Sequence, residues 1–158
     1  MDPHTFDGGR TQCESTNTEL VYSGYAAGQR YNHIAYTTRY GGPANTLCLP
    51  EDPELSNISF KSSWSLLVGA EYHVNGFAQD SADNDVRCAV CRNNNASTSI
   101  MIPGRHSCYS GWIEDYNGRL ASGHQGDTAS SYICADKNPD KFPQEKSMKM
   151  VACFILLV

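Results

Sequence analysis

The side chains of this chain that are best suited to chemistry are hydrogen-bonding groups near aromatic residues. The densest group is Asp83 to Arg87, directly before Cys88. Carboxylate, amide, imidazole and guanidinium groups can satisfy sugar hydroxyls, and an aromatic ring can cover the apolar face of the sugar. This pattern indicates a carbohydrate site. The candidate ligand-binding residues are His33, Arg39, Glu71, Asp85, Arg87, Trp112 and His124.

Most of these candidates also have a structural interpretation. Asp85 and Arg87 could pair with each other or with the backbone. His33 and His124 occupy matching stretches of the chain and could line two equivalent pockets or cap turns. Trp112, four residues after Cys108, could be a core residue beside a disulfide.

Metal binding and catalysis find little support in the sequence. The segment Asp80 to Asp85 is rich in oxygen ligands, but it lacks the spacing, the central glycine and the final glutamate of an EF-hand calcium loop. We therefore expect a solvated acidic turn there and no cofactor. No nucleophile, zinc or phosphate-loop motif is present, so we do not expect an enzyme.

Composition and charge restrict the partners. The net charge of the 158 residues is −5 and no basic cluster stands out, which argues against nucleic acid and anionic membranes. The apolar run from Val151 to Val158 is far shorter than the roughly 20 residues that span a bilayer, so no membrane insertion is expected.

The seven cysteines predict the compartment. Cys88 and Cys91 form a C-x-x-C pair, but a zinc ribbon needs a second such pair, and the chain has none. Scattered cysteines in a chain rich in Gly, Tyr and Asn predict disulfides and hence a secreted, extracellular protein. Two glycosylation sequons, at Asn57 and Asn95, agree with this; whether they are used stays open.

An internal repeat organises the chain. The pairs Gly9-Arg10 and Gly104-Arg105, and the triplets 22–24 and 116–118, keep the same order relative to three cysteines in each half. The sequence therefore predicts one compact domain made of two halves, 8–92 and 99–158, joined by the polar link 93–98. The insert 54–79 has no counterpart in the second half and is a natural place for an added function.

The repeat favours symmetric disulfides without choosing one set. One set is Cys48–Cys88, Cys134–Cys153 and Cys13–Cys108. The other is Cys13–Cys48, Cys108–Cys134 and Cys88–Cys153. Cys91 aligns with Leu156 and is expected to be unpaired or to form an interchain bridge.

Short apolar segments separated by turn residues predict strands rather than helices. The expected strands are 20–22, 66–72, 86–91, 99–102, 132–134 and 150–157, with turns at 41–43, 75–76, 103–104 and 117–118. The predicted fold is mainly β, antiparallel and disulfide-rich, with a pseudo-two-fold repeat; α+β is the alternative.

Several literal strings carry a family resemblance, among them 21–28, 48–54, 69–72, 88–92 and 101–105. They resemble the C-terminal non-collagenous domain of sponge short-chain collagens of the C4 type, and related galactose-type lectins of echinoderms such as feather stars. The resemblance covers roughly residues 8–140. It implies a non-catalytic lectin for terminal galactose, such as N-acetyllactosamine, that gains avidity as a homo-oligomer.

The same resemblance leaves a second interpretation, a matrix assembly module that binds protein. The chain has no collagen Gly-X-Y tract, which favours the lectin.

Overall fold

The structure is a computed structural model that describes residues 4–29, 44–54, 67–123, 129–140 and 152–156. Eight strands make up its regular structure, and the described residues contain no helix. The mainly-β prediction is confirmed. The strands are β1 His4–Gly8, β2 Thr18–Gln29, β3 Leu47–Pro50, β4 Leu67–Tyr72, β5 Arg87–Asn93, β6 Gly118–Ser122, β7 Ile133–Asp136 and β8 Ala152–Leu156.

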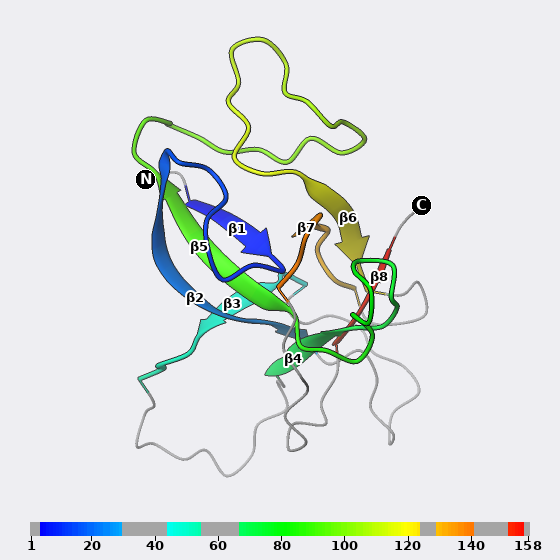
Figure 1. The fold of residues 1–158 in the computed structure, drawn as a ribbon. Helices are drawn as coiled ribbons and strands as arrows, with labels where there is room; N and C mark the ends of the chain where they lie inside the picture. The colour runs from blue at the N-terminus through cyan, green and yellow to red at the C-terminus, as the bar shows by residue number, and fades with distance from the viewer. Residues whose placement is uncertain (1–3, 30–43, 55–66, 124–128, 141–151, 157–158) are drawn as a thin grey trace.

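The strands form one sheet in the order β3-β2-β4-β8-β6-β7-β1-β5, and β2 also pairs with β5, so the pairings form a closed circuit (Figure 1). The length of β2 allows this, because its first part pairs with β5 and its end pairs with β4. Most pairs are antiparallel, but β4–β8 and β1–β7 are parallel. The prediction of an antiparallel sheet is therefore wrong for these two pairs, since alternation of apolar residues does not encode strand direction.

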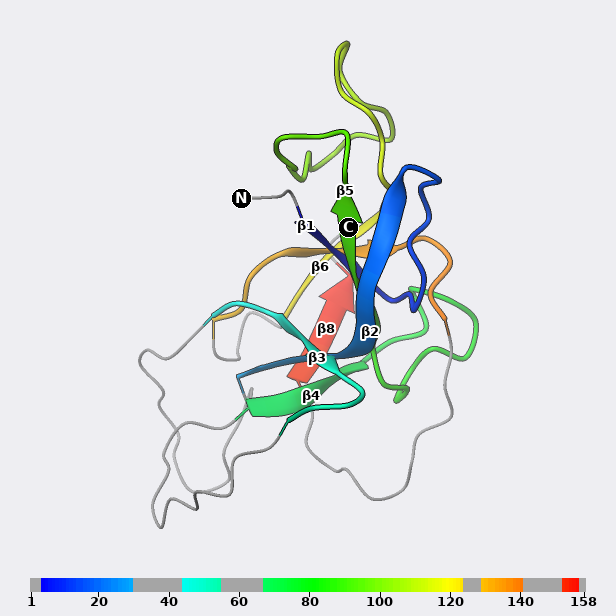
Figure 2. The ribbon, with the colours of Figure 1, turned by 90° about the vertical axis from the view of Figure 1, so that its left-hand side faces the viewer.

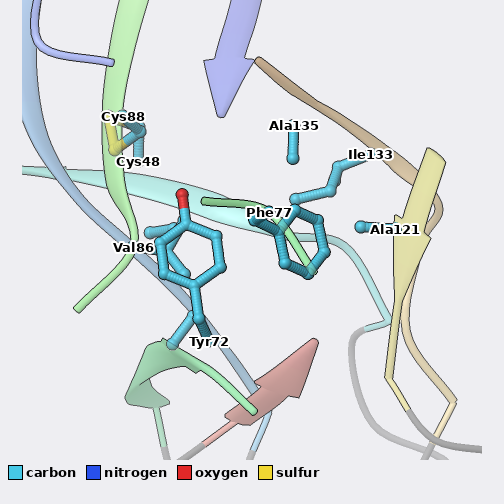
Figure 3. Close-up of a cluster of buried hydrophobic side chains, with 10 residues drawn as sticks. Cys48, Tyr72, Phe77, Val86, Cys88, Ala121, Ile133 and Ala135 are labelled. Atoms are coloured by element: carbon cyan, nitrogen blue, oxygen red, sulfur yellow. A yellow bond between two sulfur atoms is a disulfide. The ribbon is translucent and has the colours of Figure 1, made fainter. Parts of the chain in front are cut away.

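The core lies inside this circuit. Figure 3 shows the rings of Tyr72 and Phe77, whose centroids are 5.0 Å apart, beside Val86 and Ile133. Small residues complete the cluster, which also contains Ala26, Ala70, Ala121, Ala135, Cys48 and Cys88. Small side chains let the strands approach closely, while two large rings fill the centre.

Most of the predicted strands are confirmed, but the strand at 99–102 is wrong. Residues 99–102 form no strand hydrogen bonds with a neighbouring strand, and Ile100 and Met101 are exposed. The segment 94–117 instead runs outward from the sheet between β5 and β6, as both ribbon views show (Figures 1 and 2). An apolar run becomes a strand only where a neighbouring strand supplies hydrogen bonds, and the described structure offers none here.

The turn predicted at 117–118 is also wrong, because Gly118 begins β6. A Cβ atom on Gly118 would overlap the Ala135 carbonyl oxygen of β7, and one on Gly24 of β2 would overlap the Leu49 carbonyl oxygen of β3. Both glycines therefore permit close approach of two backbones rather than a turn. The turns at 75–76 and 103–104 are confirmed, and the one at 41–43 lies outside the described residues.

The β2–β3 and β6–β7 hairpins share further features at matching positions. The Tyr22 hydroxyl donates a hydrogen bond to the Cys48 carbonyl oxygen at 3.2 Å, and the Tyr116 hydroxyl donates to the Cys134 carbonyl oxygen at the same distance. The residues repeated in sequence thus form two hairpins of similar construction. The boundaries of the two halves stay a prediction.

Two disulfides are formed, Cys48–Cys88 and Cys13–Cys91. The first bridge belongs to one of the two sets that the repeat left open, and the prediction that Cys91 is unpaired or forms an interchain bridge is wrong. Because Cys108 and Cys134 are free, the predicted bridges Cys13–Cys108, Cys134–Cys153 and Cys108–Cys134 are absent, as are Cys13–Cys48 and Cys88–Cys153. The repeat symmetry did not predict this pairing. Cys13 lies between β1 and β2, both of which pair with β5, so Cys91 of β5 becomes its neighbour.

Removal of the buried Cys48–Cys88 bridge, by Cys48→Ser with Cys88→Ser, should lower the free energy of unfolding by about 4 kcal/mol. The bridge restrains a stretch of 40 residues in the unfolded chain and its sulfurs belong to the core. Urea unfolding measures the loss, and Cys108→Ser, which removes a free thiol, is the control. An unchanged midpoint in the double variant would contradict a stabilising bridge.

Candidate functional site

Three of the predicted site residues meet where β4 approaches the start of β5. Glu71 of β4 forms an isolated antiparallel bridge with Asp85, and Arg87 begins β5 two residues later. The Arg87 guanidinium forms an ion pair with Glu51 and lies 4.2 Å from the centre of the Tyr25 ring. The structure therefore places the backbones of Glu71, Asp85 and Arg87 close together where β4 meets the start of β5.

We call these residues, Glu71, Asp85 and Arg87 with Glu51 and Tyr25, the Arg87 cluster. The cluster offers little accessible surface. Arg87 and Glu71 are each only 5% exposed, and Asp85 is half-buried. The ion pair joins a buried guanidinium to a half-exposed carboxylate, so loss of Glu51 would leave the buried Arg87 charge without this ion pair, and the cluster has a clear structural use. Within the cluster a ligand could reach Tyr25, the half-exposed carboxylate of Glu51 and part of Asp85.

The acidic loop 80–85 is closed by its own polar groups. The Asn84 side-chain amide donates to the Asp80 carbonyl oxygen at 2.6 Å, and the Ala82 amide donates to the Asn75 side chain at 2.8 Å. Asp80 and Asp83 adopt positive φ values of 57° and 62°. Within the described residues, no group of three or more His, Cys, Asp or Glu side chains could hold a metal ion.

His33, Arg39 and His124 lie outside the described residues, as do Asn57 and the part 55–66 of the insert 54–79. Asn95 is exposed in the turn after β5, where its backbone amide donates to the side chain of Asn93.

A groove of about 780 Å³ lies between the outward segment 94–117 and the strands β1 and β7. We call it the Trp112 groove. Exposed aromatic residues, amides, hydroxyls and a few charged groups line it, among them Phe6, Asn93, Asn95, Ser99, Arg105, Trp112, Glu114, Asp115, Asn117, Ser131 and Tyr132.

Among the predicted site residues that the structure describes, Trp112 alone lines this groove, and it is 41% exposed. The turn that presents it is closed by a hydrogen bond from its amide to the Tyr109 carbonyl oxygen, and Gly111 before it has a φ of 88° that suits glycine. Cys108 is free, so Trp112 is not a core residue beside a disulfide. Sequence reasoning missed Tyr132, also exposed, because its importance comes only from the fold.

Polar side chains of the groove are held in place by neighbours. The Asn117 amide donates to Glu114 at 2.8 Å, and the Asn93 amide donates to Asp115 at 3.4 Å. The Tyr116 hydroxyl donates to the Phe6 carbonyl oxygen at 2.6 Å. The groove thus combines a partly open indole ring with fixed carboxylate acceptors, an arrangement that can bind a neutral polyhydroxylated ring.

The Cys134 thiol also lines the groove. Burial is the main cause that raises its pKa to about 11, and the nearby Asp7 and Asp136 act in the same direction. Because the thiolate is the nucleophile, this thiol is inert near neutral pH.

No family model, curated protein or solved structure matches the chain. The resemblance to C4-type domains and echinoderm lectins therefore stays a prediction, and the Trp112 groove carries the functional argument. In the described residues no helix is long and apolar enough to cross a membrane.

Proposed function

We propose that the chain is a secreted, non-catalytic lectin that binds terminal β-galactosides, such as N-acetyllactosamine, in the Trp112 groove. The observation that carries the proposal is the partly exposed indole ring of Trp112 in a groove that also holds Glu114 and Asp115. The apolar C–H face of galactose would stack on the ring, while the carboxylates accept hydrogen bonds from its hydroxyls. The two disulfides suit an oxidising extracellular location.

We expect weak binding at each groove, so useful avidity would come from a homo-oligomer. No metal takes part in the proposed binding, so EDTA should leave the affinity unchanged.

The Trp112→Ala variant should lose about tenfold or more of its affinity for N-acetyllactosamine, because a stacking aromatic contributes on the order of 1.5 kcal/mol or more. Isothermal titration calorimetry measures the loss. Tyr25→Ala is the matched control, since Tyr25 is 39% exposed, lies on β2 outside the groove and covers Arg87. Near-ultraviolet circular dichroism should show that both variants fold.

The two variants also separate the two candidate sites. Loss of binding in Tyr25→Ala with normal binding in Trp112→Ala would move the site to the Arg87 cluster. Normal binding in both would exclude both aromatic platforms, and turnover of a chromogenic β-galactoside would contradict the non-catalytic role.

A matrix module that binds protein is the second candidate. The side chains of Ile100, Met101 and Ile113 in the outward segment are apolar and exposed, which favours this alternative. A sugar site does not need so much exposed apolar surface, whereas a protein interface does. A glycan array without any binding, probed with folded and oxidised protein, would favour this alternative.

A further inference from the structure

The repeated Gly-Arg pairs place two arginines in equivalent local settings but in different surroundings. Gly9 and Gly104 both have positive φ, 98° and 77°, and each is followed by an arginine. Non-glycine residues rarely adopt this conformation, so the two turns are alike in backbone as well as in sequence. Arg10 and Arg105 can therefore be compared within one molecule.

Arg10 is neutralised inside the protein. One of its terminal nitrogens lies 3.7 Å from the carboxylate of Asp136 and donates to the Asn138 carbonyl oxygen at 3.1 Å. Asp136 is completely buried. The first arginine is thus part of the fold.

Arg105 has no such partner. Its guanidinium lies 4.2 Å from the centre of the Tyr109 ring, and its Nε donates to the Ser107 carbonyl oxygen at 3.1 Å. Among the described residues no carboxylate lies within 4.0 Å of it, although Glu114 and Asp115 line the same groove. The side chain is exposed, yet two contacts restrain it.

These two contacts leave the terminal nitrogens of Arg105 for a ligand. The ring of Tyr109 covers one face of the guanidinium, and the Nε bond orients its plane, so less side-chain entropy is lost when an anion binds. The planar fork matches the oxygens of a sulfate or carboxylate better than a lysine ammonium would. Glu114 and Asp115 already accept hydrogen bonds from amides, and neither one neutralises Arg105.

We propose that Arg105 binds an anionic substituent, a sulfate ester or a sugar carboxylate, on a galactoside held in the Trp112 groove. This inference rests on the proposed lectin function. The neutral sugar would lie against Trp112 and the fixed acceptors, and the anionic group would lie against Arg105. The chain would then prefer acidic galactosides to neutral ones.

Calorimetry with N-acetyllactosamine and its 3′-sulfated, 6′-sulfated and 3′-sialylated forms tests the proposal. At low salt at least one acidic form should bind roughly tenfold more tightly than the neutral sugar, as expected for a charge-assisted hydrogen bond, and added salt should reduce this preference. Arg105→Gln should abolish the preference. Arg105→Lys should keep only part of it.

Arg92→Gln is the matched control, because Arg92 is also a partly exposed arginine but is ion-paired with Glu19 on β2 and lies outside the groove. It removes the same charge and should keep the preference. Equal affinity of the wild-type protein for neutral and acidic forms would overturn the role of Arg105 while the lectin proposal stands. A preference that survives in Arg105→Gln would overturn it too, and no binding of any galactoside would reject both proposals.

Discussion

A Gly24→Ala variant is expected to lose about 3 kcal/mol or more of its free energy of unfolding, and Gly118→Ala a similar amount. In each hairpin the added methyl group would meet the backbone carbonyl of the neighbouring strand, which is part of the ladder and cannot rotate away as a side chain could. The strands would have to separate there, which removes hydrogen bonds next to the core residues Ala26 and Ala121.

Gly69→Ala provides the matched control. Gly69 also lies inside a strand, β4, but a Cβ atom there has no neighbour within 4 Å. Because alanine restricts the unfolded chain more than glycine does, this variant should be neutral or slightly more stable. Urea unfolding of the three variants gives the comparison, and equal stability of all three would show that β2–β3 and β6–β7 do not approach so closely.

The second large effect is a pH dependence of stability, which comes from the carboxyl group of Asp7, buried beside that of Asp136. Asp7 of β1 is 1% exposed, and Asp136 at the end of β7 is not exposed at all. They are brought together because β1 and β7 pair at Gly8 and Ala135. Burial first, and then the charge of Asp136, raise the pKa of Asp7 to about 8, although Arg10 acts in the opposite direction.

The protein should therefore become less stable as the pH rises. Between about pH 4 and pH 8 the folded protein keeps the Asp7 proton while the unfolded chain, with a pKa of 3.8, releases it. The free energy of unfolding then falls across this window, by several kcal/mol in total, since one pKa unit corresponds to about 1.4 kcal/mol. The charges that act on Asp7 are those of Asp136, Arg10, Glu14 and Asp140.

Asp7→Asn removes the titrating group. The free energy of unfolding of this variant should therefore decrease less with pH, so that the variant is more stable than the wild type at pH 9. Urea unfolding at several pH values measures both slopes. Asp52→Asn, at an exposed position, should keep the slope of the wild type. A wild-type stability that does not change between pH 5 and pH 9 would mean that Asp7 is ionised in the folded protein.

The Trp112 groove could be predicted only in part. An indole next to polar residues indicated a sugar platform at Trp112, but its companions come from distant parts of the chain. Thr5 and Phe6 of β1, the segment 94–117 and Tyr132 before β7 meet because β1 lies beside β7 in the sheet. Nothing in the local sequence of Tyr132 or Arg105 marks them as neighbours of one groove.

The sequence by itself determined the class of the fold, because strand-forming segments and turn residues are local signals, and it offered the Cys48–Cys88 bridge only as part of one of two possible sets. Only the tertiary structure decided the rest. The partner of Cys91, the parallel pairs and the burial of Arg87 depend on which strands become neighbours. Gly24 and Gly118 show the physical reason most clearly, since a turn and a close backbone contact both favour glycine, and only the opposite strand distinguishes them.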